Sequence, residues 1–124
     1  IITRMEGKTA VPPGESIESF ASHQASMAIY LSSGMIEELS KRLLTGGYEK
    51  DTPAAIVYKA TWPDEKAFVC TVGTLDETAR ENGITRLAVV LVGDVVKHQH
   101  YQKSKLYDAD WETEYRSAKS GQNR

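Results

Sequence analysis

The residues best placed to do chemistry in this sequence form a short polar turn, ATWPDE, at residues 60–65. The turn follows an apolar run at residues 54–58, whose length and flanking prolines, Pro53 and Pro63, are typical of a buried strand. Open α/β sheets bind their ligands outside the carboxyl ends of their strands, which is where this turn would lie. Pro63 also favours an extended conformation at Trp62, so the pattern predicts a rigid turn that faces a ligand.

Motifs for nucleophilic, phosphate or zinc chemistry are absent from the sequence. There is no nucleophile elbow, no phosphate-binding glycine loop and no zinc-ligand spacing. His98 and His100 would point the same way on a strand, but two histidines without a third ligand nearby do not make a metal site. We therefore interpret the pair as part of a solvated loop and expect no bound metal.

The composition is that of one ordinary globular domain. The 124 residues are long enough to bury a single core, and 40% are hydrophobic and 26% charged. A net charge of −2 without a dense Lys/Arg cluster argues against a nucleic-acid partner, and no apolar stretch is long enough to span a membrane. The single cysteine, Cys70, excludes an internal disulfide and fits a reducing compartment. We expect a cytoplasmic protein.

Alternating strand-like and helix-like segments must position the turn. Apolar runs predict five strands, and apolar residues at spacings of three and four predict three helices between them. The run LAVVLV at residues 87–92 has no polar alternation, which is typical of a central strand covered on both faces. The pattern predicts an α/β fold: a single three-layer-like domain with a mixed sheet of about five strands and flanking helices. The predicted strands lie at residues 1–5, 27–31, 54–58, 67–72 and 87–92, and the predicted helices begin near residues 15, 33 and 74.

Two helix starts carry specific capping predictions. Ser32 or Ser33 is in place to cap the second helix, which Gly46 and Gly47 would end because glycine readily adopts the left-handed conformation. Thr74 and Glu77 have the Thr-x-x-Glu spacing of a capping box for the third helix.

Five blocks of the sequence, in order, resemble the tetrapyrrole methylases: IITRMEGKTAVPPGES, ASMAIYLSS, TPAAIVYKATWPDEK, ENGITRLAVVLVG and SKLYD. Within that family they are most similar to members that methylate carbon 11 of precorrin-4 or cobalt-precorrin-4 in cobalamin biosynthesis. Family members are about twice as long. The resemblance therefore implies that residues 1–116 are a C-terminal domain and that the N-terminal domain is absent from this chain. The loss of any apolar pattern towards the chain end predicts that residues 117–124 are a disordered tail.

The resemblance also implies a cofactor, S-adenosylmethionine, bound together with the missing N-terminal domain. The positions that match the family's cofactor contacts are Leu31, Ala60, Thr61, Leu87 and Ala88. Leu31 stands where many relatives have methionine. Without the resemblance, Leu31 and Leu87 would be interpreted as core residues, because apolar residues on strands are usually buried.

A tetrapyrrole substrate is strongly anionic, so the resemblance gives the charged turn a second role. Lys59, Trp62 and Asp64 are expected on the substrate side of the site, and Arg4 could meet a substrate carboxylate. The alternative is that Trp62 packs the turn while the charged groups are solvated. No residue can be assigned as a general base.

Relatives of this kind are homodimers, and this chain alone would be inactive because half of the cleft is missing. Two other functions stay open: a tetrapyrrole methylase that modifies a different ring carbon, and a non-catalytic binding or dimerisation module.

Overall fold

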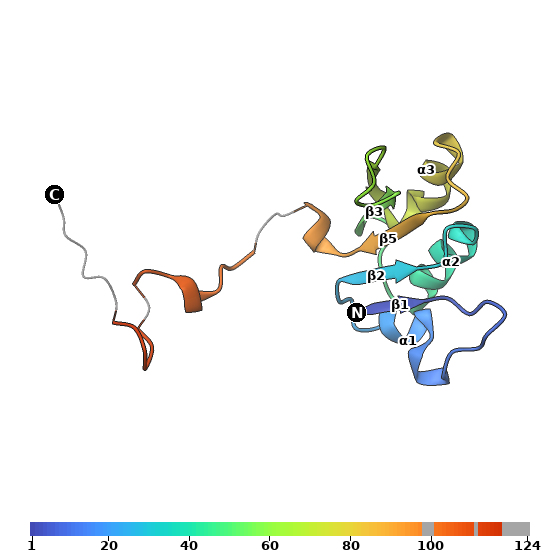
Figure 1. Cartoon of the computed structure of the whole chain (residues 1–124). Coiled ribbons are helices and arrows are strands. Elements are labelled where there is room, and N and C mark those ends of the chain that lie inside the picture. Colours follow the sequence, from blue (N-terminus) through green and yellow to red (C-terminus); the bar gives the residue numbers. More distant parts are fainter. Residues whose placement is uncertain (98–100, 111, 118–124) are drawn as a thin grey trace.

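The computed structural model describes residues 1–97, 101–110 and 112–117 and contains one mixed five-stranded sheet (Figure 1). The strand order is β1-β2-β5-β3-β4; β1 and β2 are parallel, and every other neighbouring pair is antiparallel. The predicted mixed sheet is confirmed, with the run at residues 87–92 at its centre. The strands are β1 (Ile2–Arg4), β2 (Met27–Tyr30), β3 (Pro53–Tyr58), β4 (Lys66–Thr71) and β5 (Ala88–Val92).

In the described part of the chain, three α-helices and four short 3-10 helices connect or follow the strands. They are α1 (Ile17–Ala21), α2 (Ile36–Gly46), α3 (Leu75–Glu81), η1 (Pro13–Glu15), η2 (Val72–Thr74), η3 (Asp94–Lys97) and η4 (Lys105–Tyr107). No helix in the described ranges is long and apolar enough to cross a membrane.

The hydrophobic core lies between one face of the sheet and the three α-helices. Alternate residues of β2, β3 and β5 are buried on this face, as the two-residue period of a strand requires. Residues from α1, α2 and α3 belong to the same buried cluster. The members with large, fully buried side chains are Ile17, Ile29, Leu39, Leu43, Ile56, Leu75, Val90 and Val92.

The opposite face of the sheet is apolar and partly open in the described residues. Val89 and Leu91 of β5 are half-buried, although the unbroken apolar run predicted a strand covered on both faces. Ile2 and Val69, on the outer strands β1 and β4, are 81% and 64% exposed. The reason is that α1, α2 and α3 all pack on the core face, so no α-helix of the described chain covers these residues.

Both capping predictions are wrong, and the reason is the same for each. The Ser32 hydroxyl donates to the Tyr30 carbonyl (2.8 Å) and accepts from the Met5 amide (3.3 Å), so α2 starts without a side-chain cap. The Thr74 hydroxyl accepts from the Thr71 amide (3.0 Å) and closes a capping box around η2 instead of α3. In each case the hydroxyl accepts a hydrogen bond from a backbone amide outside the predicted helix and therefore does not cap that helix.

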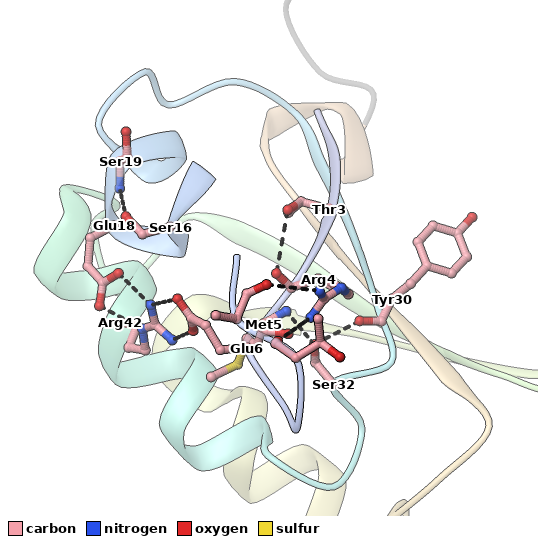
Figure 2. A network of polar contacts seen from close by, with 12 residues as sticks. Thr3, Arg4, Met5, Glu6, Ser16, Glu18, Ser19, Tyr30, Ser32 and Arg42 are labelled. Atoms are coloured by element: carbon pink, nitrogen blue, oxygen red, sulfur yellow. Dashed lines mark hydrogen bonds and ion pairs between the residues drawn. The ribbon is translucent and has the colours of Figure 1, made fainter. Parts of the chain in front are cut away.

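One arginine ties α2 to α1 and to the segment after β1 (Figure 2). The Arg42 guanidinium donates to Glu18 (2.6 and 2.8 Å) and also forms an ion pair with Glu6. Hydrogen bonding to Arg42 lowers the pKa of Glu6 to about 2, and it also lowers the pKa of Glu18. Three segments separated in sequence therefore share one partly buried charge cluster.

Replacing Arg42 by leucine should lower the free energy of unfolding by about 2 kcal/mol at neutral pH, because two neighbouring carboxylates lose their common donor. Carboxylates with a depressed pKa stabilise the fold above their unfolded pKa, and this contribution disappears as the pH falls towards the folded value. The difference between wild type and variant should therefore narrow below about pH 4.5. Urea unfolding at several pH values measures it.

Lys41→Leu is the matched control, because Lys41 is the preceding residue of α2 and forms an exposed pair with Glu37 (2.8 Å). An exposed pair of this kind contributes little to stability, because water screens it. Equal losses for both variants, or a difference independent of pH, would contradict the role assigned to Arg42.

Candidate functional site

The ends of three strands meet at one edge of the sheet. Because β5 is antiparallel to both β2 and β3, its start lies beside the ends of those two strands. Leu31 directly follows β2, Leu87 directly precedes β5, and the turn at residues 59–65 follows β3. The amide of Lys59 donates to the carbonyl of Leu87 (2.8 Å), which fixes the turn against β5.

The backbone is strained at this edge. Five non-glycine residues of the described chain have positive φ, and four of them lie here: Leu31 (56°), Lys59 (48°), Thr61 (73°) and Leu87 (57°). Side chains in this region of φ cost about 1–2 kcal/mol each, and such conformations cluster at functional sites. None of these residues is a glycine or asparagine, so no local sequence signal pointed to the strain.

A hollow of about 330 Å³, hereafter the strand-end hollow, opens between these strand ends. Most of its walls are aliphatic or aromatic. The structure thus brings together Leu31, Ala60, Leu87 and Ala88 of the predicted cofactor set with Lys59 and Trp62 of the predicted substrate set; Thr61 and Asp64 lie in the same turn but are not wall residues. The lining residues are Tyr30, Leu31, Ser33, Val57, Lys59, Ala60, Trp62, Leu87, Ala88 and Val89.

Leu31 and Leu87 are not core residues, although their sequence neighbours form strands. Leu31 is 81% exposed and Leu87 is 50% exposed. Each combines an exposed apolar side chain with a left-handed backbone, and neither property stabilises the domain. Both side chains are therefore available at the surface beside the hollow.

The turn after β3 is held by an ion pair and by contacts of its lysine with two aromatic rings. Lys59 Nζ lies 2.6 Å from Asp64 Oδ2, and 5.3 Å and 5.2 Å from the ring centroids of Tyr58 and Trp62. The hydrogen bond between Lys59 and Asp64 raises the pKa of Lys59 and lowers the pKa of Asp64. The turn presents a stacked tryptophan that is 53% exposed, and its lysine charge is neutralised within the turn.

The segment after β1, residues 5–12, lies beside the same edge and is called the β1 loop. The Arg4 guanidinium donates to the carbonyls of Met5 (3.0 Å), Thr9 (3.2 Å) and Ala10 (3.4 Å). Figure 2 shows Arg4 next to Ser32, whose hydroxyl joins the Met5 amide to the end of β2. The β1 loop is therefore fastened to the strand end that carries Leu31. Sequence reasoning singled out Arg4 but not the loop that it organises.

No set of three or more metal-ligating side chains occurs in the described ranges 1–97, 101–110 and 112–117. His98 and His100, which we interpreted as a solvated pair, lie outside the described residues.

Leu31 offers a direct test of the strain. Leu31→Gly should raise the free energy of unfolding by about 0.5 kcal/mol, because relief of the left-handed strain exceeds the entropy that glycine loses on folding. Leu31→Ala keeps the strain and removes only an exposed side chain, so its stability should match wild type. Thermal unfolding of the two variants measures the difference, and a loss of stability on Leu31→Gly would contradict it.

Comparison with known proteins gives a consistent result. Residues 1–76 match the family model described as Tetrapyrrole (Corrin/Porphyrin) Methylases. The chain is 43% identical over 118 residues to the cobalt-precorrin-4 C(11)-methyltransferase of Methanocaldococcus jannaschii, covering 95% of this chain and 46% of that protein. The enzyme of the same name from Priestia megaterium is 42% identical over 111 residues, covering 87% and 43%. The chain thus spans less than half the length of these curated relatives.

Solved structures show the same fold. A cobalt precorrin-4 methyltransferase superposes with a TM-score of 0.73 at 43% identity, covering 77% of this chain and 40% of that one. A uroporphyrin-III C-methyltransferase from Thermus thermophilus, complexed with S-adenyl homocysteine, superposes with a TM-score of 0.61 at 19% identity, covering 77% and 41%. At that identity the second likeness concerns the fold alone.

Proposed function

Because this chain belongs to the tetrapyrrole (corrin/porphyrin) methylases, we propose that residues 1–116 form the C-terminal domain of an S-adenosylmethionine-dependent methyltransferase that modifies carbon 11 of a precorrin-4-type ring. The observation that carries this proposal is the 43% identity to a cobalt-precorrin-4 C(11)-methyltransferase along 95% of the chain. The relatives named for the cobalt-containing substrate are 43% and 42% identical, whereas those named precorrin-4 C(11)-methyltransferase reach 35%. This difference favours cobalt-precorrin-4 as the substrate.

The strand-end hollow suits one side of an S-adenosylmethionine site. Its aliphatic walls at Leu31, Leu87 and Ala88 match the faces of an adenine ring, and the small Ala60 lets the ring approach the backbone of the turn. Thr61 follows Ala60 in the same strained turn and offers a hydroxyl beside it. The exposure of the two leucines is explained if a ligand covers them, which is the argument for assigning the hollow to the cofactor.

When bound, S-adenosylmethionine supplies an already activated methyl group, so this chain needs to contribute position and not strong acid–base catalysis. Methyl transfer requires the donor sulfur, the methyl carbon and the acceptor carbon to lie in line, in a site from which water is excluded. The fixed backbone at the strand ends would hold the reacting groups in line, and the apolar hollow would exclude water. Lys59, Trp62 and Asp64 would form a rigid lip on the substrate side.

We expect the whole protein to be a cytoplasmic homodimer. The partly open apolar sheet face, with Ile2 81% exposed and Val69 64% exposed, supports burial against another domain or subunit.

The test is methyl transfer by the full-length protein that contains this chain. Release of S-adenosylhomocysteine in the presence of cobalt-precorrin-4, with the new methyl group located on carbon 11 by NMR, would establish the activity. A product methylated elsewhere would assign a different member of the family. A folded full-length protein that binds no S-adenosylhomocysteine would instead be a non-catalytic module.

A further inference from the structure

The β1 loop and the end of β2 enclose a second hollow of about 310 Å³, hereafter the loop hollow. Its walls come from Arg4, the β1 loop, Leu31 and Met35. Leu31 also lines the strand-end hollow, so the two hollows share a wall at the end of β2. A ligand that extends past Leu31 from the strand-end hollow would therefore reach the β1 loop.

The β1 loop is fixed in place before any ligand arrives. Arg4 holds three of its carbonyl groups, and Ser32 holds the amide of Met5. Glu6 is paired with Arg42 of α2, which anchors the start of the loop to the helical layer (Figure 2). Binding to such a loop loses little conformational entropy, which favours recognition of a specific group.

The charges around the loop hollow are not balanced. Its lining contains two cations, Arg4 and Lys8, and no carboxylate. Lys8 is exposed and forms no ion pair with any described residue, while Arg4 donates only to neutral carbonyls. The nearby acid Glu6 is already paired with Arg42.

Lys59 differs from Lys8 because it has a carboxylate partner. It lies at the same sheet edge, but Asp64 neutralises it at 2.6 Å. Lys8 and Arg4 of the loop hollow therefore have no carboxylate partner among the described residues, whereas Lys59 of the turn has one.

We propose that the loop hollow is a carboxylate-binding subsite, in which Lys8 forms an ion pair with an acidic side chain of the substrate that lies beside the cofactor of the strand-end hollow. Arg4 is a positioning residue: it holds the loop and adds positive potential. This inference rests on the proposed function, because it takes the substrate to be a ring carrying several carboxylates. It assigns Lys8 a specificity role that does not involve the methyl-transfer step itself.

The experiment compares Lys8→Gln, Lys8→Glu and Lys8→Arg in the full-length protein by steady-state kinetics. Loss of the cation should raise KM for the tetrapyrrole about tenfold in Lys8→Gln and further in Lys8→Glu. kcat and the Kd of S-adenosylhomocysteine should stay within about twofold, since the subsite binds substrate and transition state equally. Lys8→Arg should retain most of the wild-type KM.

Lys50→Gln is the control: Lys50 is also an exposed lysine without an ion pair to any described residue, but it lies before β3, at the opposite end of that strand from the turn. An active enzyme whose KM is the same in wild type, Lys8→Gln and Lys8→Glu would overturn the subsite and leave the proposed function standing.

If the wild-type protein transfers no methyl group, the proposed function fails and binding alone decides the subsite. The probe is then uroporphyrin, a porphyrin with eight carboxylates, titrated by fluorescence against wild type and Lys8→Glu. Weaker binding by Lys8→Glu supports the subsite. Equal binding by both proteins, or no binding by wild type, overturns it.

Discussion

Replacing Ala60 by tryptophan in the full-length protein should weaken the binding of S-adenosylhomocysteine by at least about a hundredfold. Ala60 lines the strand-end hollow together with Trp62 and Leu87. An indole at this position would occupy the space that the adenine ring is proposed to fill. The turn cannot move aside easily, because Lys59 is bonded both to Asp64 and to the Leu87 carbonyl.

Isothermal titration calorimetry measures this effect, and two further variants make it specific. Ala60→Gly removes only a methyl group and should keep the affinity within about threefold. Ala109→Trp introduces the same indole at an exposed position outside the site and should leave binding unchanged. Wild-type affinity in Ala60→Trp would remove the cofactor from the strand-end hollow, whatever the reaction of the protein.

Replacing Gly46 by alanine should lower the free energy of unfolding by about 3 kcal/mol. Gly46 ends α2 where that helix crosses α1. A Cβ atom there would lie 2.5 Å from the Ala21 Cβ, 2.8 Å from the Glu18 carbonyl oxygen and 2.9 Å from the Glu18 Cα. The atoms it meets are backbone or a buried methyl group, so the two helices would have to separate.

Helix propensity alone predicts the opposite sign, since alanine is favoured over glycine by about 1 kcal/mol inside a helix. Urea unfolding therefore tests whether helix propensity or the tertiary contact with α1 determines the change in the free energy of unfolding. Gly14→Ala is the control, because a Cβ at Gly14 meets no atom within 4 Å. A stabilised Gly46→Ala variant would mean that α1 and α2 are not packed as closely as described.

The strands and helices were largely predictable because their apolar residues repeat with the period of the element. The strand at residues 87–92 was assigned to the sheet centre from its unbroken apolar run, and the structure confirms that position. Helix starts were less predictable. Ser32 and Thr74 carry the correct groups for capping, but each hydroxyl bonds to an amide outside the predicted helix.

The candidate site was likewise predictable only in part. The sequence predicted the location of the proposed site after β3 and a rigid turn there, because the Trp-Pro pair in the turn that follows the strand leaves few backbone choices. The partner of Lys59 did not, since any of several acids near it in sequence could have paired with it. The role of Arg4 in holding the β1 loop was also hidden, because it depends on carbonyl groups whose directions are set by the path of the loop.

The sequence by itself therefore determined the types and order of the elements and the family, and it predicted the edge of the sheet at which we propose that a ligand binds. Only the tertiary structure decided which residues are strained or exposed at that edge. Leu31 and Leu87 have apolar side chains typical of core residues, yet both turn outward and have positive φ. The reason is that the antiparallel pairing of β5 with β2 and β3 forces three strand ends to meet there. Such a constraint joins residues far apart in the chain, and apolar periodicity within one segment contains no information about it.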